Sequence, residues 1–244
     1  MTDSPRANSL VIAAAILAGG MIAGGGWLGH NIAETRLADR SVTVRGLAER
    51  DVTADLATWT LAFSSTGNDV APVQAKIDRD TAAIRAYLKR YGFADAEVAT
   101  AGVSVNQWVD NNPAYGTEGR RNVTVRQRLQ LRTTKVMDAR RAAAGVSELV
   151  RAGVALEEGS NVTYSFTRLE SVKPAMIATA TRDARRGAEQ FAKDSGSGVG
   201  GIKHAAQGYF SVGPRDGEGG SERGGADTPF QKVRVVTTID FYLD

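Results

Sequence analysis

"NVTVRQRLQLR", residues 122–132, alternates apolar and polar side chains more regularly than any other stretch of the sequence. Because successive side chains of a strand point to opposite faces, one face carries the apolar residues Val123, Val125, Leu129 and Leu131. The opposite face carries Thr124, Arg126, Arg128, Gln130 and Arg132. Such a strand is typical of an antiparallel sheet that helices cover on one side only. The stretch therefore predicts an α+β fold in which antiparallel sheets are packed by helices.

The residues before this strand predict two strands, a helix and a third strand. Residues 41–65 are expected to form the first two strands, with a turn near Glu49–Arg50. A helix is expected to begin at Asn68 or Asp69 and to end near Gly92, because these residues flank an apolar pattern of helical period. The strand over residues 98–109 follows. Its inward face is predicted to hold Ala101, Val103, Val105 and Val109.

The residues after this strand predict two helices and three further strands. A helix is expected over about 135–151, a strand over 154–168, and a long alanine-rich helix over about 171–194. The apolar stripe of the long helix is predicted to be Ile177, Ala180, Ala184, Ala188 and Phe191. Small residues in this stripe would let the helix lie close to the sheet. Residues 202–212 and 232–243 are expected to pair as a closing hairpin.

The order of these elements repeats within the chain. Strand, helix, strand and strand occur over about 52–132, and the same order recurs over about 154–243. The repeat is too long for a solenoid. The sequence therefore predicts two βαββ-like halves, preceded by an N-terminal hydrophobic helix.

An uncharged stretch at residues 10–29 suggests contact with a membrane. Twenty residues of helix span about 30 Å, the thickness of a bilayer core, although the stretch is rich in glycine. Residues 1–29 are therefore interpreted as a membrane anchor or a cleaved signal peptide, with the uncleaved anchor preferred. Residues 30–40 would form a linker, and residues 41–244 the α+β domain.

Composition excludes several kinds of chemistry. The chain has 244 residues, of which 42% are hydrophobic and 23% are charged, so it can bury a core. A formal net charge of +3 is too small to indicate a nucleic-acid partner. The chain has no cysteine, which rules out disulfides and thiolate chemistry. Its only histidines are His30 and His204, so a histidine-rich metal site is not expected.

Several motifs contain residues that could bind a nucleotide or act in catalysis, but each fits a structural role better. The glycines in Gly196–Lys203 have dinucleotide-loop spacing, but they follow a helix instead of preceding one. Ser195 and His204 lack the strand-to-helix turn of a nucleophile elbow. The carboxylates of Glu157–Glu158 and of Asp51 with Asp55 could pair as an acid and a base, but solvated positions fit them better. We expect no catalytic residue, metal or cofactor here.

Three arginines on the polar face of the strand at 122–132 are the strongest candidate binding residues. Arg126, Arg128 and Arg132 would form a basic stripe that meets a polyanion or a partner subunit. A sheet face in contact with water is the simpler interpretation. Aromatic residues that would interleave with these arginines in an RNA-binding sheet are missing from residues 122–132.

Three segments resemble the SIMPL-domain family. They are "SVTVRGLAERDVTADLATWTLAF" at the start of the domain, "KPAMIATATRDARRGAEQFAKDSGSGVGGIKHAAQGYFSV" at the long helix, and "KVRVVTTIDFYL" at the end. The likeness covers about residues 41–244. It implies an α+β domain exported in bacteria, homo-oligomerisation and a link to oxidative stress. It implies no catalytic residues, since none are established for that family.

These observations together predict a non-enzymatic protein of the bacterial cell envelope. We expect residues 10–29 to hold it at the inner membrane with the domain in the periplasm; in the alternative, the protein is cleaved and periplasmic. It would act by homo-oligomeric assembly or by binding, with a possible role in envelope or oxidative stress. The alternative function is an envelope hydrolase with a carboxylate site that no motif reveals.

Overall fold

A computed structural model describes residues 17–21, 40–110, 120–216 and 227–244. Contacts divide the chain into two units. The terminal unit holds the residues up to Ala48, Ile177–Tyr209 and Val235–Asp244. The internal unit holds Glu49–Met176 and Phe210–Arg234. The boundary falls within three elements, β1 (Ser41–Thr53), α5 (Leu169–Asp194) and β8 (Phe230–Leu243).

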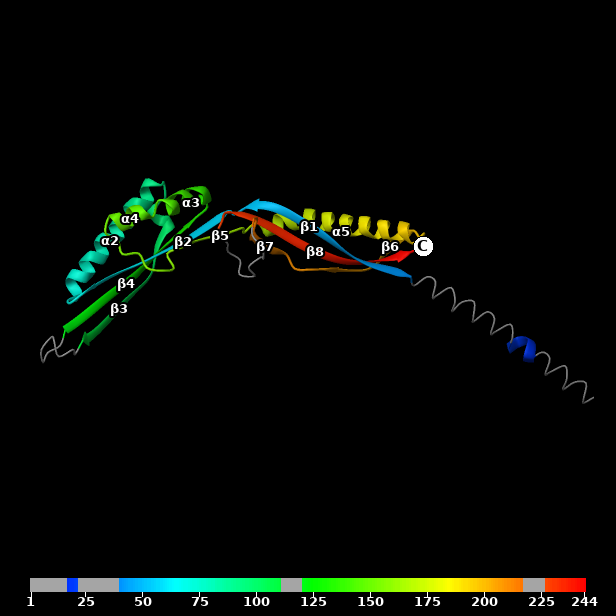
Figure 1. Ribbon diagram of the computed structural model, residues 1–244, viewed down its shortest axis with the longest axis horizontal. Helices are drawn as coiled ribbons and strands as arrows, with labels where there is room; N and C mark the ends of the chain where they lie inside the picture. Colours follow the sequence, from blue (N-terminus) through cyan, green and yellow to red (C-terminus); the bar gives the residue numbers. More distant parts are fainter. Residues whose placement is uncertain (1–16, 22–39, 111–119, 217–226) are drawn as a thin grey trace, which may run out of the picture. The chain divides into compact units, whose positions relative to one another are not determined.

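The internal unit contains a four-stranded antiparallel sheet in the order β3-β4-β2-β5. Its strands are β2 (Leu56–Gly67), β3 (Val98–Asp110), β4 (Arg120–Thr133) and β5 (Val162–Ser165). The helices α2 (Val70–Arg90), α3 (Val136–Ala144) and α4 (Ser147–Arg151) lie on one side of this sheet (Figure 1). A short 3₁₀ helix, η1 (Asp95–Glu97), precedes β3. The predicted α+β class with antiparallel sheets packed by helices is confirmed.

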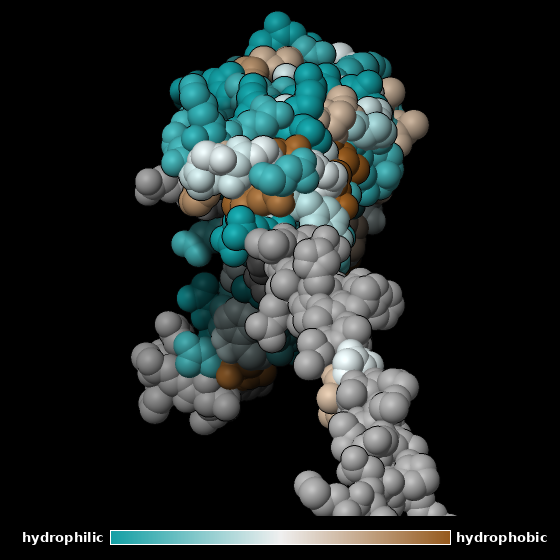
Figure 2. Space-filling model, turned by 90° about the vertical axis from the view of Figure 1, so that its right-hand side faces the viewer, coloured by the Kyte–Doolittle hydropathy of each residue, from teal (hydrophilic) through white to brown (hydrophobic). Residues whose placement is uncertain are grey.

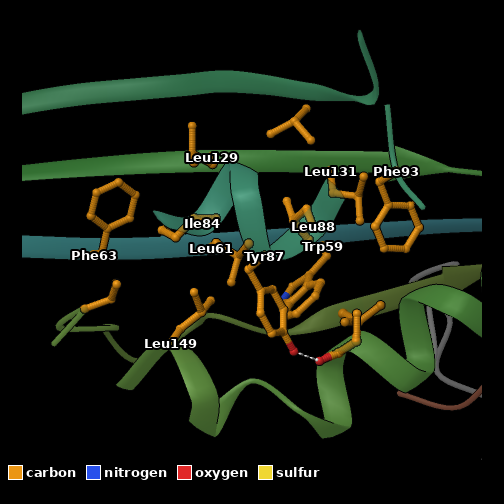
Figure 3. Close-up of a cluster of buried hydrophobic side chains, with 14 of the residues drawn as sticks. Trp59, Leu61, Phe63, Ile84, Tyr87, Leu88, Phe93, Leu129, Leu131 and Leu149 are labelled. Atoms are coloured by element: carbon orange, nitrogen blue, oxygen red, sulfur yellow. Dashed lines mark hydrogen bonds between the residues drawn. The ribbon is translucent and has the colours of Figure 1, made fainter. Parts of the chain in front are cut away.

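The core of the internal unit lies between α2 and the two middle strands. Trp59 lies opposite Leu131 and Leu61 lies opposite Leu129 in the register of β2 and β4. Figure 3 shows these side chains together with Ile84, Tyr87 and Leu88 of α2. All are fully buried, and each contributes about 1.5–3 kcal/mol of hydrophobic free energy relative to an exposed position. The alternation predicted for residues 122–132 is confirmed in β4 at Val123, Val125, Leu129 and Leu131.

The terminal unit packs α5 onto a sheet in the order β1-β8-β6, where β6 is Val199–Gln207. A short strand, β7 (Ser211–Pro214), pairs with the part of β8 that belongs to the internal unit. Ala184 and Ala188 of α5 contact Ile239 and Phe241 of β8 in a small apolar cluster. The pairing of β6 with β8 agrees with the predicted closing hairpin.

The two predicted halves exist, but the second takes its first strand from elsewhere in the chain. The run β2-α2-β3-β4 places its last strand between the other two, in the order β2-β4-β3. The run β1-α5-β6-β8 has the same arrangement, in the order β1-β8-β6. The prediction assigned residues 154–168 to the second half. Instead, β5 pairs with β2, and β1 begins the second half.

Two predicted element boundaries are wrong for identifiable reasons. The first strand runs through Glu49–Arg50 and ends at Thr53, because backbone pairing continues along β1. The helix expected over 135–151 is two helices that break at Gly145. A Cβ at Gly145 would lie 2.6 Å from the Tyr91 hydroxyl, so any other residue here would displace that side chain.

The buried stripe of α5 differs from the predicted one at its ends. Ala180, Ala184 and Ala188 are fully buried, as expected. Phe191 is 65% exposed, which contradicts its predicted place in the stripe. Val172, Met176 and Ala192 take the buried positions, because the stripe follows a strict four-residue step.

The proposed membrane segment lies mostly outside the described residues. Residues 17–21 form a short helix, and residues 1–16 and 22–39 are not described. Within the described part of the chain, no helix is both long and apolar enough to cross a bilayer. Figure 2 shows that hydrophilic residues predominate on the face turned to the viewer, with small hydrophobic areas between them.

Candidate functional site

The sheet face of the internal unit that the helices leave uncovered carries the three predicted arginines. Arg126, Arg128 and Arg132 occupy alternate positions of β4 and are exposed, as the sequence predicted. Arg126 lies opposite Ser64 of β2, and Arg128 lies opposite Ala62. The neighbouring residues of this face are therefore small, and the arginine side chains have room above them.

Two of the three arginines line a hollow of about 360 Å³. Its wall also contains two glutamates and several small residues: Ala62, Gly102, Val103, Ser104, Glu157 and Glu158. Ala62 and Gly102 lie opposite Arg128 from the two flanking strands, where short side chains leave the space open. Arg132 does not line this hollow, because it lies four residues further along β4, about 13 Å from Arg128.

The charge of the hollow is balanced, not basic. Arg126 Nε donates to Glu157 Oε1 at 2.9 Å. The backbone holds Glu157 in place, since its N–H donates to the Ala62 carbonyl at 2.8 Å. Ser160 fixes the same loop, because its hydroxyl donates to the Ala62 carbonyl and accepts from the Ala62 N–H. The predicted basic stripe is thus interrupted by an acidic loop that is distant in sequence.

Arg128 differs from Arg126 in its partners. Among the described residues, Arg128 forms no ion pair, and its guanidinium lies over Gly102. A Cβ at Gly102 would be 3.6 Å from Arg128 Nη2. An arginine that points over a glycine on an exposed sheet face offers a flat cation to whatever lies beside it.

The edge strand β3 carries an apolar surface that the sequence did not lead us to expect. Val103, Val105, Trp108 and Val109 are 56%, 51%, 46% and 48% exposed, respectively. Three of them were predicted to face the core. They do not, because α2 packs on β2 and β4 and leaves β3 uncovered. The alternating pattern identified the strand correctly but gave no sign that it lies at the edge.

The other free edges in the described part of the chain are shielded. Strand β6 contains glycines and Lys203, and its pairing with β8 shifts register at two places. Strand β1 carries several charged residues, and its Leu47 N–H donates to Asp183 Oδ2 of α5. Strand β5 has four residues, and its Tyr164 carbonyl accepts from Gln231 Nε2. In contrast, residues 102–109 of β3 contain no charge and no proline.

The structure places the remaining sequence candidates in structural roles or on the surface. Gly196 adopts a positive φ of 70° after α5, which agrees with helix termination. The Ser195 hydroxyl donates to the Ala192 carbonyl at the end of α5. His204 lies exposed on β6 opposite Asp240.

Asp55, which the sequence suggested as a partner of Asp51, is held by the residues that precede α5. Asp55 Oδ1 accepts from the Thr167 N–H and hydroxyl, and Oδ2 accepts from Arg168 Nε. Burial alone would raise the pKa of Asp55, but these hydrogen bonds outweigh it and hold the pKa below its ordinary value. Asp55 therefore stays ionised and ties β2 to the start of α5.

The comparisons with known proteins identify the family. No curated protein matches the chain at a significant level. The sequence profile of SIMPL, described as "Protein of unknown function (DUF541)", matches residues 42–241. This range contains nearly all of both sheets, the long helix α5 and the hollow on β4. The resemblance found in the sequence is thus confirmed over nearly all of the described domain, and the chain belongs to the SIMPL family.

Proposed function

We propose that this protein is a non-enzymatic component of the bacterial cell envelope that acts by assembling with copies of itself. One observation carries the proposal, namely the half-exposed edge strand β3, whose residues 102–109 carry no charge. An edge strand presents a row of unpaired backbone groups to any strand that approaches it. Soluble proteins usually blunt such edges with charges, prolines or bulges, and the chain does so at β6 and β1 but not along residues 102–109.

Burial of the exposed valines and the tryptophan of β3 provides the driving force for assembly. Three valines and one tryptophan are each about half exposed along this strand. Removing apolar surface from water contributes about 25 cal/mol per Å². Backbone pairing adds geometric specificity, because it fixes the orientation of the added strand.

The assembly proposal is tested by sedimentation of the full-length protein in mild detergent over a hundredfold range of concentration. We expect the average mass to rise with concentration. A matched variant, Val105→Lys, places a charge at the middle of the edge and should lower the average mass without unfolding the protein. Monomers at every concentration for the wild-type chain would rule the proposal out.

The envelope location rests on the uncharged stretch at residues 10–29 and on the family resemblance. Cell fractionation combined with the intact mass of the mature chain tests it. A full-length mass in the membrane fraction supports the anchor, and a shortened mass in the periplasm supports a cleaved signal. A full-length chain that is freely soluble inside the cell contradicts both. A role in oxidative stress predicts that a deletion strain is more sensitive to peroxide than its parent.

A further inference from the structure

We propose that β3 pairs with β3 of a second copy, antiparallel and centred on Val105, and that Trp108 of each copy packs against Arg128 of the other. The inference rests on the proposed function, and it names the surface and the contacts through which the copies meet. The paired strands would join two four-stranded sheets into one continuous sheet.

The neutrality of residues 102–109 of β3 favours a second copy as the occupant of this edge. In antiparallel self-pairing, the residues next to the two-fold axis lie close to their own copies, so a charge at the centre of the strand is destabilising. Residues 102–109 contain no charged side chain, so their self-pairing carries no such cost. The irregularity of β3 lies before this segment, between Thr100 and Gly102.

The centre at Val105 follows from the side chains that the pairing would match. In this register Val105 meets Val105 of the second copy on the face that α2 covers elsewhere. On the opposite face, Gly102 meets Trp108 of the second copy. Both residues belong to the face of Arg126 and Arg128, because Gly102 pairs with Arg128 and Trp108 pairs with Asn122 in β4. Glycine is the residue that leaves space for an indole ring at that position.

Arg128 is placed to contact Trp108 of the second copy in this register. Its guanidinium lies beside Gly102, so an indole above Gly102 lies beside a cation that has no carboxylate partner among the described residues. An arginine next to the face of a tryptophan forms a cation–π contact, and it is stronger where water is excluded. The two-fold symmetry of the pair makes this contact twice. This register thus gives a binding partner to the exposed indole of Trp108 and to the guanidinium of Arg128, which has no carboxylate partner in the described part of the chain.

The absence of cysteine from the chain makes the register directly measurable by disulfide trapping. In antiparallel strands, directly opposite residues have Cα atoms about 4.5–5.5 Å apart, within the range that a disulfide accepts. We expect full-length Val105→Cys to form covalent dimers under mild oxidation at least about tenfold faster than Ala206→Cys. Ala206 is the matched control because it is exposed on β6, the edge strand of the other sheet.

The outcomes of this experiment separate the two proposals. Fast trapping of Val105→Cys supports both. Equal or faster trapping of Ala206→Cys, or no trapping of Val105→Cys while the wild type still assembles, overturns the β3 interface and leaves assembly in place. A wild-type chain that stays monomeric overturns assembly and the interface together.

The contact between Trp108 and Arg128 has its own test. We expect Arg128→Ala and Trp108→Ala each to raise the dimer dissociation constant by about three- to thirtyfold, because two symmetric contacts are lost. Arg132→Ala is the matched control, since Arg132 lies on the same face of β4 but away from the hollow. The double variant Arg128→Ala/Trp108→Ala should be no weaker than the worse single variant. Equal effects of Arg128→Ala and Arg132→Ala, or fully additive effects in the double variant, would contradict the contact.

Discussion

Gly46 of β1 and Ala180 of α5 approach each other so closely that no side chain fits between them. A Cβ at Gly46 would lie 1.9 Å from the Ala180 carbonyl oxygen and 2.6 Å from the Ala184 nitrogen. Both obstacles are backbone atoms of a helix, so they cannot move aside as the end of a flexible side chain would. The alanine stripe of α5 and the glycine of β1 thus set the distance between helix and sheet in the terminal unit.

We expect Gly46→Ala to destabilise the terminal unit by about 1–3 kcal/mol, the usual cost of inserting a methyl group into a filled space. Amide hydrogen exchange of peptides from residues 40–48 and 177–194 measures this loss. Exchange in the internal unit should change much less. Gly201→Ala is the control, because a Cβ there meets no atom within 4 Å. Equal protection in Gly46→Ala and the wild type would show that the helix can move away.

The Tyr87 hydroxyl links α2 to the end of α3 inside the core of the internal unit. It donates to the Ala142 carbonyl at 2.5 Å, and both groups are buried (Figure 3). Burial raises the pKa of Tyr87, so the hydroxyl keeps its proton. Tyr87→Phe leaves the carbonyl without this donor, and we expect a loss of about 1–3 kcal/mol in the free energy of unfolding. Urea titration followed by tryptophan fluorescence, to which the buried Trp59 contributes, measures it. A loss below a few tenths of a kcal/mol would show that another donor replaces the hydroxyl.

The sequence predicted the parts of the fold that depend on local periodicity. The two faces of β4, the start of α2 after Asp69 and the alanine stripe of α5 all follow from residue spacing. Periodicity cannot tell which strand lies at the edge of a sheet, because a central strand and an edge strand can carry the same alternation. Val103 and Val105 were therefore assigned to the core, and the surface that they form was missed.

The candidate site was only partly predictable for a related reason. The alternation of β4 placed Arg126, Arg128 and Arg132 on one face. The charge of that face depends on Glu157, which comes from a loop about thirty residues away and pairs with Arg126. The spacing of residues near β4 does not indicate that this loop lies beside the strand. The same applies to β1, which joins the second βαββ run across more than a hundred residues of intervening chain.

Phe191 is exposed, so the observed buried stripe of α5 and the stripe predicted from the sequence imply different effects of a substitution at this residue. We expect Phe191→Gln to change the free energy of unfolding by less than about 0.5 kcal/mol, as for most surface substitutions. Ala188→Leu should cost about 1–3 kcal/mol, because Ala188 is fully buried against the sheet. Hydrogen exchange of the α5 peptides compares the two variants. A larger loss of protection in Phe191→Gln would restore Phe191 to the packed face.

The carboxylate of Asp55 makes the stability of the internal unit depend on pH in a defined direction. Its pKa in the folded protein is lowered by hydrogen bonds from Thr167 and Arg168, which outweigh the effect of burial. Because the pKa is lowered, this stabilisation is fully present above the pKa of the unfolded chain, about 3.9, and it is lost as pH falls through the pKa of the folded protein.

We expect Asp55→Asn to cost about 1–3 kcal/mol at pH 7, and the difference from the wild type to shrink as pH falls below about 4. Urea titrations from pH 7 down to pH 3, followed by Trp59 fluorescence, give both curves. If the Asp55→Asn difference stayed constant over this range, the cost would come from lost packing, not from the ionised carboxylate.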